Sequence, residues 1–265
     1  MTGRDHDTCR VCGGRSLFTY SQRVLDDDVR YFDCAACGYF QTEKPYWLEK
    51  AYASAINDVD TGILWRNQLN VRRVLMTLSA FGKLSGVVVD HAGGYGILVR
   101  LLRDVGVDAR WRDKYCANLL ARGFEADGTR CDLLTAFEVF EHLEYPLAEL
   151  ESLLAQAPVV LLSTDLIRQT APPAPDWWYL GQEHGQHIGF FRERTLAGMA
   201  KKLGCHHASD GRSLHVFSHE PIPRRWLPMQ RLNRLAPLVT AGALRSRVQS
   251  DFEALRRSGA PLPPP

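Results

Sequence analysis

Hydrophobic and polar positions along the chain follow two periods, which predicts a mixture of strands and helices. The apolar run Val87-Val-Val suits a short strand buried on both faces, and it stops at Asp90. A turn of small residues follows, and the apolar positions up to Leu102 then recur at helical spacing. We take this strand, turn and helix as the stretch around which the rest of the chain is organised.

The same patterns predict further elements on both sides of this stretch. Strands that alternate with helices are typical of an α/β protein with a largely parallel sheet. The expected helices are 64–81, 147–155 and 192–203, with helical patches between 221 and 257. The expected strands are 107–113, a short one near 124–127, 131–137, 159–163, and a final pair at 205–210 and 213–219.

The turn after the first strand has the chemistry of a nucleotide-binding corner. Gly93, Gly94 and Gly96 allow the backbone to bend sharply and approach a ligand closely, and the next helix presents N–H groups to negative charge. Asp113 ends the second predicted strand, where a carboxylate can accept hydrogen bonds from ribose hydroxyls. The alternatives are a tight connection without a ligand, and an Asp113 that caps the segment 118–122.

Four of the seven cysteines form two pairs near the N-terminus. Cys9-Arg-Val-Cys12 and Cys34-Ala-Ala-Cys37 each turn two thiolates toward one point, and a glycine follows each pair. Four sulfur ligands leave no position open for water, so we expect a structural zinc ion that does no chemistry. An iron–sulfur site and two disulfides are the competing interpretations.

A loop at 172–191 gathers aromatic rings, a carboxylate and two imidazoles after a run of prolines. An imidazole can accept a proton near neutral pH, and a neighbouring carboxylate can orient it or strengthen it as a base. A purely structural loop is the alternative. A second metal site on the two histidines has no supporting pair of Cys or Asp nearby. The residues singled out are Trp177, Trp178, Tyr179, Glu183, His184 and His187.

Composition restricts the class of protein without naming it. The chain has 265 residues, 45% hydrophobic and 23% charged, which is enough for one full α/β domain and a small accessory module. A net charge of +2 argues against a nucleic-acid partner. We find no signal-peptide pattern and no run that would cross a membrane, so we expect a cytoplasmic protein.

The glycine turn resembles the first motif of the Rossmann-like methyltransferases that use S-adenosylmethionine. Asp90, Gly94 and Gly96 match the motif, and Ala92 stands where its first glycine usually stands. The resemblance implies an α/β fold with helices on both faces of the sheet and an antiparallel hairpin at its edge. It also implies that S-adenosylmethionine binds along the whole turn, Gly93 included.

A second motif, Glu138-Val-Phe-Glu-His142-Leu, resembles a turn found in many small-molecule methyltransferases. The resemblance implies that Glu138 lies near the reacting sulfonium and His142 near the adenosine or the substrate. Both residues also have structural interpretations, since His142 can simply cap its helix.

With the cysteine pairs and the histidine loop, residues 9–219 resemble zinc-ribbon methyltransferases of bacterial sugar, surface-polysaccharide and natural-product pathways. Tyr52 matches the recurring linker tyrosine of the sugar C-methyltransferases, and Glu183-His184 matches their loop pair. We therefore expect His184, helped by Glu183, to be the general base, with His187 and Tyr52 as alternatives. The three aromatic residues 177–179 would shape the pocket of the acceptor, whose methylated atom is carbon, oxygen or nitrogen.

These expectations divide the chain into a zinc ribbon (1–45), an aromatic and helical linker (46–81), a Rossmann-like methyltransferase domain (82–220) and a helical tail (221–265). The expected partner is a small-molecule methyl acceptor, without a membrane, and an oligomer formed through the tail stays open. Two other functions stay open as well. One is a methyltransferase that modifies RNA, gripped by the ribbon and the arginine-rich tail, and the other is a catalytically silent binding protein.

Overall fold

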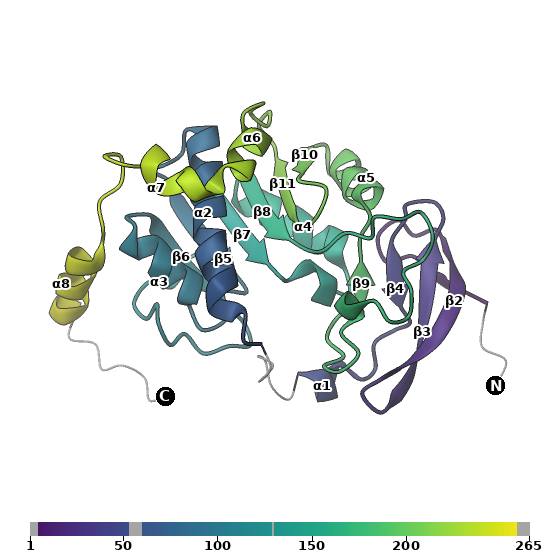
Figure 1. Cartoon of the computed structure of the whole chain (residues 1–265). Helices are drawn as coiled ribbons and strands as arrows, with labels where there is room; N and C mark the ends of the chain where they lie inside the picture. The colour runs from purple at the N-terminus through teal and green to yellow at the C-terminus, as the bar shows by residue number, and fades with distance from the viewer. Residues whose placement is uncertain (1–4, 53–59, 129, 259–265) are drawn as a thin grey trace. The chain divides into compact units, whose positions relative to one another are not determined.

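The computed structural model describes residues 5–52, 60–128 and 130–258. The chain forms two compact units, each assembled from separate stretches of sequence (Figure 1). We call residues 1–57, 138–153 and 162–219 the ribbon unit, and residues 58–137, 154–161 and 220–265 the glycine-turn unit. The four contiguous domains predicted from the sequence stay a prediction.

The ribbon unit contains a five-stranded antiparallel sheet in the order β1-β2-β3-β4-β9. Its first four strands come from the N-terminal segment, and the fifth comes from the end of the histidine loop. Phe40 pairs with Phe190, so residues separated by 150 positions lie side by side. The strands are β1 (His6–Thr8), β2 (Arg15–Val24), β3 (Asp27–Cys34), β4 (Phe40–Thr42) and β9 (Gly189–Phe190).

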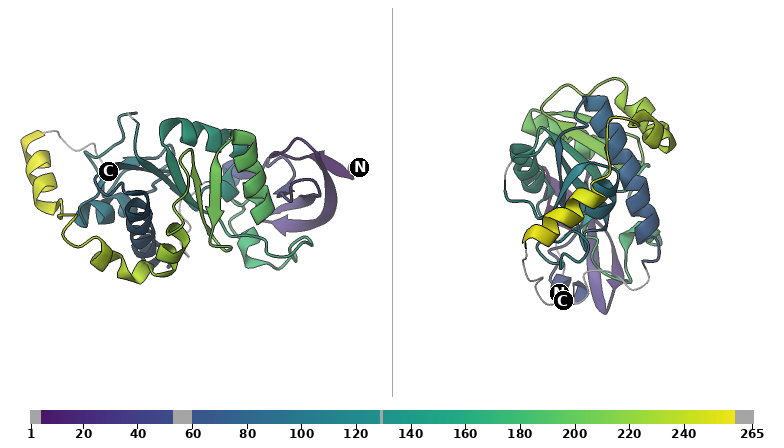
Figure 2. Two further views of the ribbon diagram at one scale, coloured as in Figure 1. Left: turned by 90° about the horizontal axis from the view of Figure 1, so that it is seen from above. Right: turned by 90° about the vertical axis from the view of Figure 1, so that its left-hand side faces the viewer.

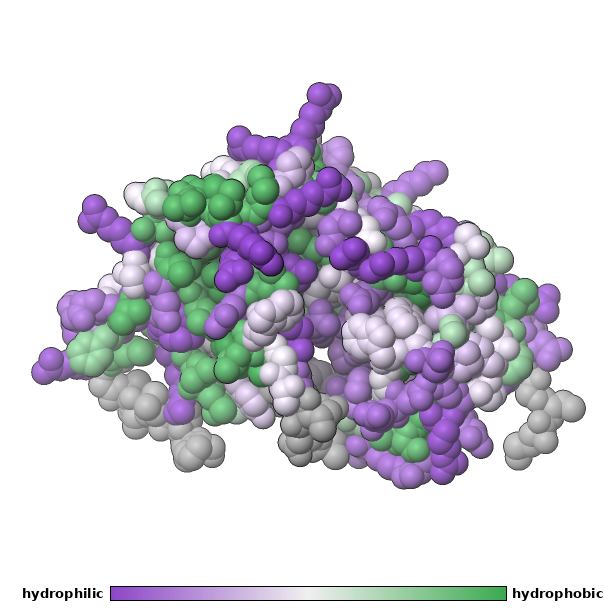
Figure 3. Space-filling view, in the orientation of Figure 1, coloured by the Kyte–Doolittle hydropathy of each residue, from purple (hydrophilic) through white to green (hydrophobic). Residues whose placement is uncertain are grey.

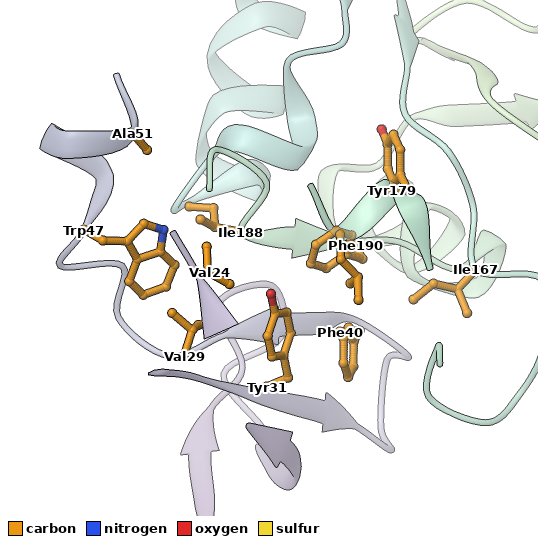
Figure 4. Close-up of a cluster of buried hydrophobic side chains, with 11 residues drawn as sticks. Val24, Val29, Tyr31, Phe40, Trp47, Ala51, Ile167, Tyr179, Ile188 and Phe190 are labelled. Atoms are coloured by element: carbon orange, nitrogen blue, oxygen red, sulfur yellow. The ribbon is translucent and has the colours of Figure 1, made fainter. Parts of the chain in front are cut away.

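One hydrophobic core joins these strands to the linker and the loop (Figure 4). The rings of Tyr31 and Phe40 stack with their centroids 5.6 Å apart, and Trp47 of the linker is buried with them. Burial of side chains this large removes much apolar surface from water, which is the main force that holds the loop against the ribbon. The core consists of Val24, Val29, Tyr31, Phe40, Trp47, Ala51, Ile167, Tyr179, Leu180, Ile188 and Phe190.

The other elements of the ribbon unit lie before, within and after the histidine loop. Helix α5 packs against strand β10, which forms an antiparallel hairpin with β11 (Figures 1 and 2). These elements are α1 (Leu48–Ala51), the 3-10 helices η1 (Phe140–His142) and η2 (Trp178–Leu180), α5 (Glu193–Leu203), β10 (His206–Ser209) and β11 (Leu214–Ser218). Helix α4 (Pro146–Gln156) and strand β8 (Val159–Ser163) each contribute residues to both units.

In the glycine-turn unit, strand β5 (Val87–His91) pairs in parallel with β6 (Asp108–Arg112) on one side and β7 (Leu133–Phe137) on the other. Its inner valines are buried, as a strand covered on both faces requires. Helices α2 (Ile63–Phe81) and α3 (Ile97–Asp104) pack together in this unit. The strand order of the six-stranded sheet is β10-β11-β8-β7-β5-β6. The predicted α/β fold, with parallel strands and an antiparallel hairpin at the edge of the sheet, is confirmed.

The C-terminal tail packs within the glycine-turn unit. Trp226 is fully buried, and its indole N–H donates to Thr77 Oγ1 of α2 at 3.1 Å. Farther along, Asp251 accepts two hydrogen bonds from the buried guanidinium of Arg103, at 2.7 and 2.8 Å. Apolar side chains gather over α2 and the α6–α7 segment (Figure 3). The tail elements are α6 (Trp226–Arg231), η3 (Asn233–Leu235), α7 (Ala236–Val239) and α8 (Val248–Ser258).

One predicted element differs in the structure. The segment near 124–127 forms no named strand, and only an isolated bridge joins Glu125 to Trp111. Two backbone hydrogen bonds tie this segment to β6: the amide of Trp111 donates to the carbonyl of Phe124, and the carbonyl of Trp111 accepts the amide of Ala126, each at 2.8 Å. In the described residues, no helix combines the length and the hydropathy needed to span a bilayer.

Candidate active site

The glycine turn joins β5 to α3 in the glycine-turn unit. Gly94 and Gly96 have φ values of 54° and 85°, in the left-handed region that glycine tolerates. Ala92 takes the same conformation, with φ 55°, although it has a Cβ. The backbone therefore keeps the bend of the glycine motif at this position, at the steric cost that an L-residue bears there.

Asp113 ties the turn to the end of β6. Its Oδ2 accepts the amide of Gly94 at 2.9 Å, and its Oδ1 accepts the amides of Tyr115 and Cys116 at 2.7 and 2.8 Å. The indole of Trp111 donates to the carbonyl of Gly94 at 2.8 Å from the same strand. The predicted meeting of the two strand ends is therefore present, and the carboxylate is fixed in one orientation by three N–H groups.

Asp90 is buried near the end of β5, just before the turn. Thr135 donates to its Oδ1 at 2.6 Å across the β5–β7 pair. Burial raises the pKa of Asp90 to about 7, although the Thr135 hydrogen bond opposes this shift.

In the ribbon unit, the four predicted metal ligands converge. The sulfur atoms of Cys9, Cys12, Cys34 and Cys37 all lie within 4.8 Å of one another, and none forms a disulfide. A hydrogen bond from Cys37 lowers the pKa of Cys9 to about 5, despite the opposing effect of burial. The amide of Gly14 also donates to Sγ of Cys12 at 3.3 Å. This set of four sulfur donors fits a tetrahedral zinc ion. Among the described residues, no further ligand beside the cluster favours iron over zinc.

The ribbon and linker position the histidine loop through hydrogen bonds to its backbone. Arg10 donates to the carbonyl of Ile188 at 2.5 Å, and the amide of Thr42 donates to the same carbonyl at 3.1 Å. The indole of Trp47 donates to the carbonyl of Gly185 at 2.8 Å. Arg10 lies between the two cysteines of the first pair, so the segment that carries the cysteine cluster contacts the backbone of the loop directly.

A buried ion pair fastens the far end of the loop to the same sheet. Arg192 bonds both oxygens of Asp33, at 2.7 and 3.1 Å, and also donates to the carbonyl of Gly38 at 2.7 Å. Its side chain is 5% exposed, so the pair is shielded from solvent. Breaking such a pair typically costs about 3–5 kcal/mol, because one charge stays buried and unpaired.

Three imidazoles cluster inside the ribbon unit. The ring centroid of His187 lies 4.8 Å from that of His142 and 4.7 Å from that of His184. Burial lowers the pKa of all three, that of His142 to about 4. They are therefore neutral at pH 7, and each has one nitrogen that can accept a proton or a metal ion.

The hydrogen bonds of these rings decide which nitrogen is free. Nδ1 of His142 lies 3.1 Å from the carbonyl of Gln186, and Nδ1 of His187 lies 2.6 Å from the carbonyl of Tyr179. A carbonyl only accepts, so both Nδ1 atoms carry the proton and both Nε2 atoms have a lone pair. In His184 the two nitrogens exchange roles: Nδ1 accepts the amide of Gln186 at 3.1 Å, so the proton is on Nε2.

Glu141 lies beside this cluster and was not assigned a role from the sequence. It is fully buried, and its two carboxylate oxygens have no hydrogen-bond partner of normal geometry among the described residues. Burial, with the nearby charge of Glu138, raises its pKa well above the usual value, and the hydroxyls of Tyr179 and Thr164 oppose this only in part. The Glu-His-Leu motif contains this residue, but the sequence pattern gives no sign that its carboxylate is buried.

The other predicted site residues take distinct positions in the ribbon unit. Glu138 is an exposed residue with φ 54°, and its amide and carboxylate both bond the hydroxyl of Ser163. The ring of Tyr52 lies 6.3 Å from that of His142. Tyr179 belongs to the hydrophobic core, Trp178 is 73% exposed, and Trp177 packs against Tyr179 and Phe190. Their part in holding an acceptor stays a prediction, as does that of the exposed Glu183.

The predicted site residues thus fall into two groups, each described within its own unit. The glycine-turn unit brings together Asp90, Ala92, Gly93, Gly94, Gly96 and Asp113. The ribbon unit brings together Tyr52, His142, His184 and His187, with Glu141 added by the structure. The first group has the features of a nucleotide-type cofactor corner, and the second has the features of a proton-transfer or metal-binding cluster.

Comparison with known proteins agrees with a methyltransferase class for this fold. The family model described as a methyltransferase domain matches residues 64–209, more than half of the chain. No functionally curated protein matches the chain. The chain therefore belongs to the methyltransferase-domain family, and the predicted enzyme class, an S-adenosylmethionine-dependent methyltransferase, is confirmed.

Solved structures that are similar to the chain include two methyltransferases. The magnesium protoporphyrin IX methyltransferase of Synechocystis PCC 6803, with bound SAH, is 18% identical, with a TM-score of 0.43 over 64% of this chain and 92% of that chain. The plantazolicin methyltransferase BamL, in complex with a triazolic desmethylPZN analog and SAH, is 11% identical, with a TM-score of 0.45 over 65% of this chain and 91% of that chain. Both likenesses concern the fold and not the acceptor.

Proposed function

We propose that the protein transfers the methyl group of S-adenosylmethionine to a small molecule, such as a sugar, a nucleotide sugar or a natural-product intermediate. The observation that carries the proposal is the pairing of Asp113 with the amide of Gly94 in the glycine turn. This pairing places a fixed carboxylate beside the turn that the family motif assigns to the cofactor. Asp113 would accept the ribose hydroxyls, and the backbone of the turn would approach the methionine part of the cofactor.

In this proposal, the residues that assist the methyl acceptor belong to the ribbon unit. The cofactor already carries its leaving group, so the protein mainly has to align the nucleophile and assist the loss of its proton. Neutral imidazoles with a free Nε2 can assist in this way, and His142 and His187 both present one. The tautomer favours His187 over the expected base His184, whose Nδ1 already accepts an amide.

The zinc ion is proposed as a structural part of this arrangement. Cys9, Cys12, Cys34 and Cys37 would hold it, and it would stabilise the ribbon that positions residues 185–188. With four protein ligands it has no open position, so no step of the reaction is assigned to it. A cytoplasmic location and a role in biosynthesis stay part of the proposal.

The function can be tested by following a labelled methyl group. The protein is incubated with methyl-labelled S-adenosylmethionine and, in separate arms, with nucleotide sugars, phenolic natural-product intermediates and RNA. We expect label in a small molecule and not in RNA. Label in RNA, with strong salt dependence, would indicate the RNA-modifying alternative. A protein that binds the cofactor and labels nothing in a broad acceptor panel would fit a silent binding protein.

A further inference from the structure

The unpartnered carboxylate of Glu141 needs a physical explanation. Its oxygens are buried and have no hydrogen-bond partner of normal geometry among the described residues. A buried polar group left in this state destabilises the fold, and the cost is larger when the group is charged. Native structures satisfy such groups with a neighbouring side chain, an ordered water or an ion.

The imidazole rings of two histidines lie near this carboxylate. Nε2 of His142 is 4.0 Å from Oε1 of Glu141. One potential ligand atom from each of Glu141, His142 and His187 can be chosen so that all three lie within 4.8 Å of one another. The residues come from η1 and from the histidine loop, which the amide of Ile188 joins by donating to the carbonyl of Glu141 at 2.8 Å.

The tautomers of the two histidines suit metal binding. A histidine that binds a metal usually donates its other ring N–H to a carbonyl or carboxylate, which orients the ring and makes the ligand nitrogen more basic. His142 and His187 both donate Nδ1–H to backbone carbonyls. The two Nε2 lone pairs are therefore held in place before any ion arrives. His184, with the opposite tautomer, is not a member of this set.

We propose that Glu141, His142 and His187 bind a divalent ion of the zinc class, separate from the ion of the four cysteines. Two imidazoles and one carboxylate are the ligand set of catalytic zinc sites that keep a position open for water or substrate. Bonds of about 2.0–2.1 Å put tetrahedral ligand atoms about 3.3 Å apart. Small side-chain movements, about 1 Å, would bring these three atoms to that separation.

The second ion deepens the proposed function and rests on it for its role. With Nε2 of His142 and of His187 bound to the ion, the ion takes the place of a free imidazole in assisting the loss of the acceptor's proton. An acceptor oxygen that binds at the open position loses its proton to solvent water, because the ion lowers its pKa. That oxygen then forms a bond to the methyl carbon of S-adenosylmethionine. The bond from the same carbon to sulfur breaks, and its electron pair stays on sulfur. The products are the methylated acceptor, S-adenosylhomocysteine and one proton in solvent.

Metal content tests the site without any measurement of activity. Full-length protein is equilibrated with excess zinc, freed of unbound ion, and analysed for zinc per chain by elemental mass spectrometry. We expect two zinc ions in the unaltered protein and one in Glu141→Gln and in His187→Gln. His207→Gln is the matched control, because His207 is another largely enclosed histidine of the ribbon unit, beside the ring of His215, and it should keep both ions.

A single zinc ion in the unaltered protein, or two in both variants, would overturn the proposal. If a variant misfolds by circular dichroism, cobalt titration of the unaltered protein decides instead. We expect bands of a nitrogen- and oxygen-bound ion in addition to the sulfur charge-transfer bands of the ribbon, and sulfur bands alone would overturn the site. If the protein transfers methyl groups while it holds a single zinc ion, the second metal site is wrong and the proposed function stands. If the protein holds two zinc ions but does not bind S-adenosylmethionine, the second metal site stands and the proposed function is wrong.

Discussion

At the scale of single residues, Asp90 shows how burial gives a carboxyl group an unusual titration. Its pKa is raised from 3.8 to about 7, so the folded protein holds the proton more tightly than the unfolded chain. The stability from this difference is fully present below about pH 4. It declines as pH rises toward 7, and it is lost above that value.

Asp90→Asn should remove this dependence, because an amide does not titrate in that range. The free energy of unfolding of the unaltered protein, relative to the variant, should fall from pH 4 to pH 7. Urea unfolding at a series of pH values measures it. Asp104→Asn, with an acid on the outer part of α3 whose side chain is 41% exposed, is the control and should leave the pH profile in place. If the free energy of unfolding depends on pH in the same way in the unaltered protein and in Asp90→Asn, the raised pKa is not that of Asp90.

The tautomers predict unequal effects at two loop histidines. His187→Gln should lower the turnover number about a hundredfold or more, the usual loss when a group that assists proton transfer is removed. His184→Gln should lower it less, because the Nδ1 of His184 is already occupied by the amide of Gln186. Steady-state methyl transfer, with cofactor affinity measured alongside, gives the comparison. A larger loss for His184→Gln would restore that residue as the base.

The sequence could indicate residues of this kind but not their surroundings. Asp113 follows the first acidic strand end by about twenty positions, and that spacing was enough to predict its place beside the glycine turn. The burial of Glu141 and the proton positions of the histidines depend on carbonyls and side chains far away in the sequence. No local pattern contains that information.

At the scale of elements, the ribbon sheet and the histidine loop form one folding unit. The pairing of β4 with β9 and the bonds to Ile188 join the cysteine-bound segment to the loop. The cysteine spacing predicted the ribbon, and the alternating patterns predicted most helices and strands. The sequence could not predict β9, since a two-residue strand has no periodicity and exists only through its partner.

Loss of the proposed zinc ion should therefore loosen the loop. In Cys12→Ser, the amide of Ile188, which donates to the carbonyl of Glu141, should exchange hydrogen with solvent faster. The reason is that Arg10 and Thr42 would no longer hold the carbonyl of Ile188, so the loop would open more often. Hydrogen exchange followed by mass spectrometry measures this. Peptides from α2 in the glycine-turn unit are the internal control and should be unchanged. Equal protection of the loop amides in Cys12→Ser and in the unaltered protein would contradict the claim that the cysteine cluster helps to hold the loop.

At the scale of the whole molecule, both units combine stretches that are distant in the sequence. The ribbon unit uses residues 138–153 and 162–219 in addition to the N-terminal segment. The tail returns to the glycine-turn unit, where Asp251 pairs with Arg103. Composition and motif order predicted the class of fold, but contiguous boundaries were the only division that a linear pattern could offer.

The central claim is that the glycine turn binds S-adenosylmethionine with Asp113 as a ligand. Calorimetric titration of the folded, zinc-loaded protein with the cofactor tests it most directly. We predict binding that Asp113→Ala weakens about tenfold or more, as expected for loss of hydrogen bonds to a charged group, and that Asp104→Ala leaves unchanged. Absence of binding in folded protein, or equal affinity in Asp113→Ala, would contradict the account.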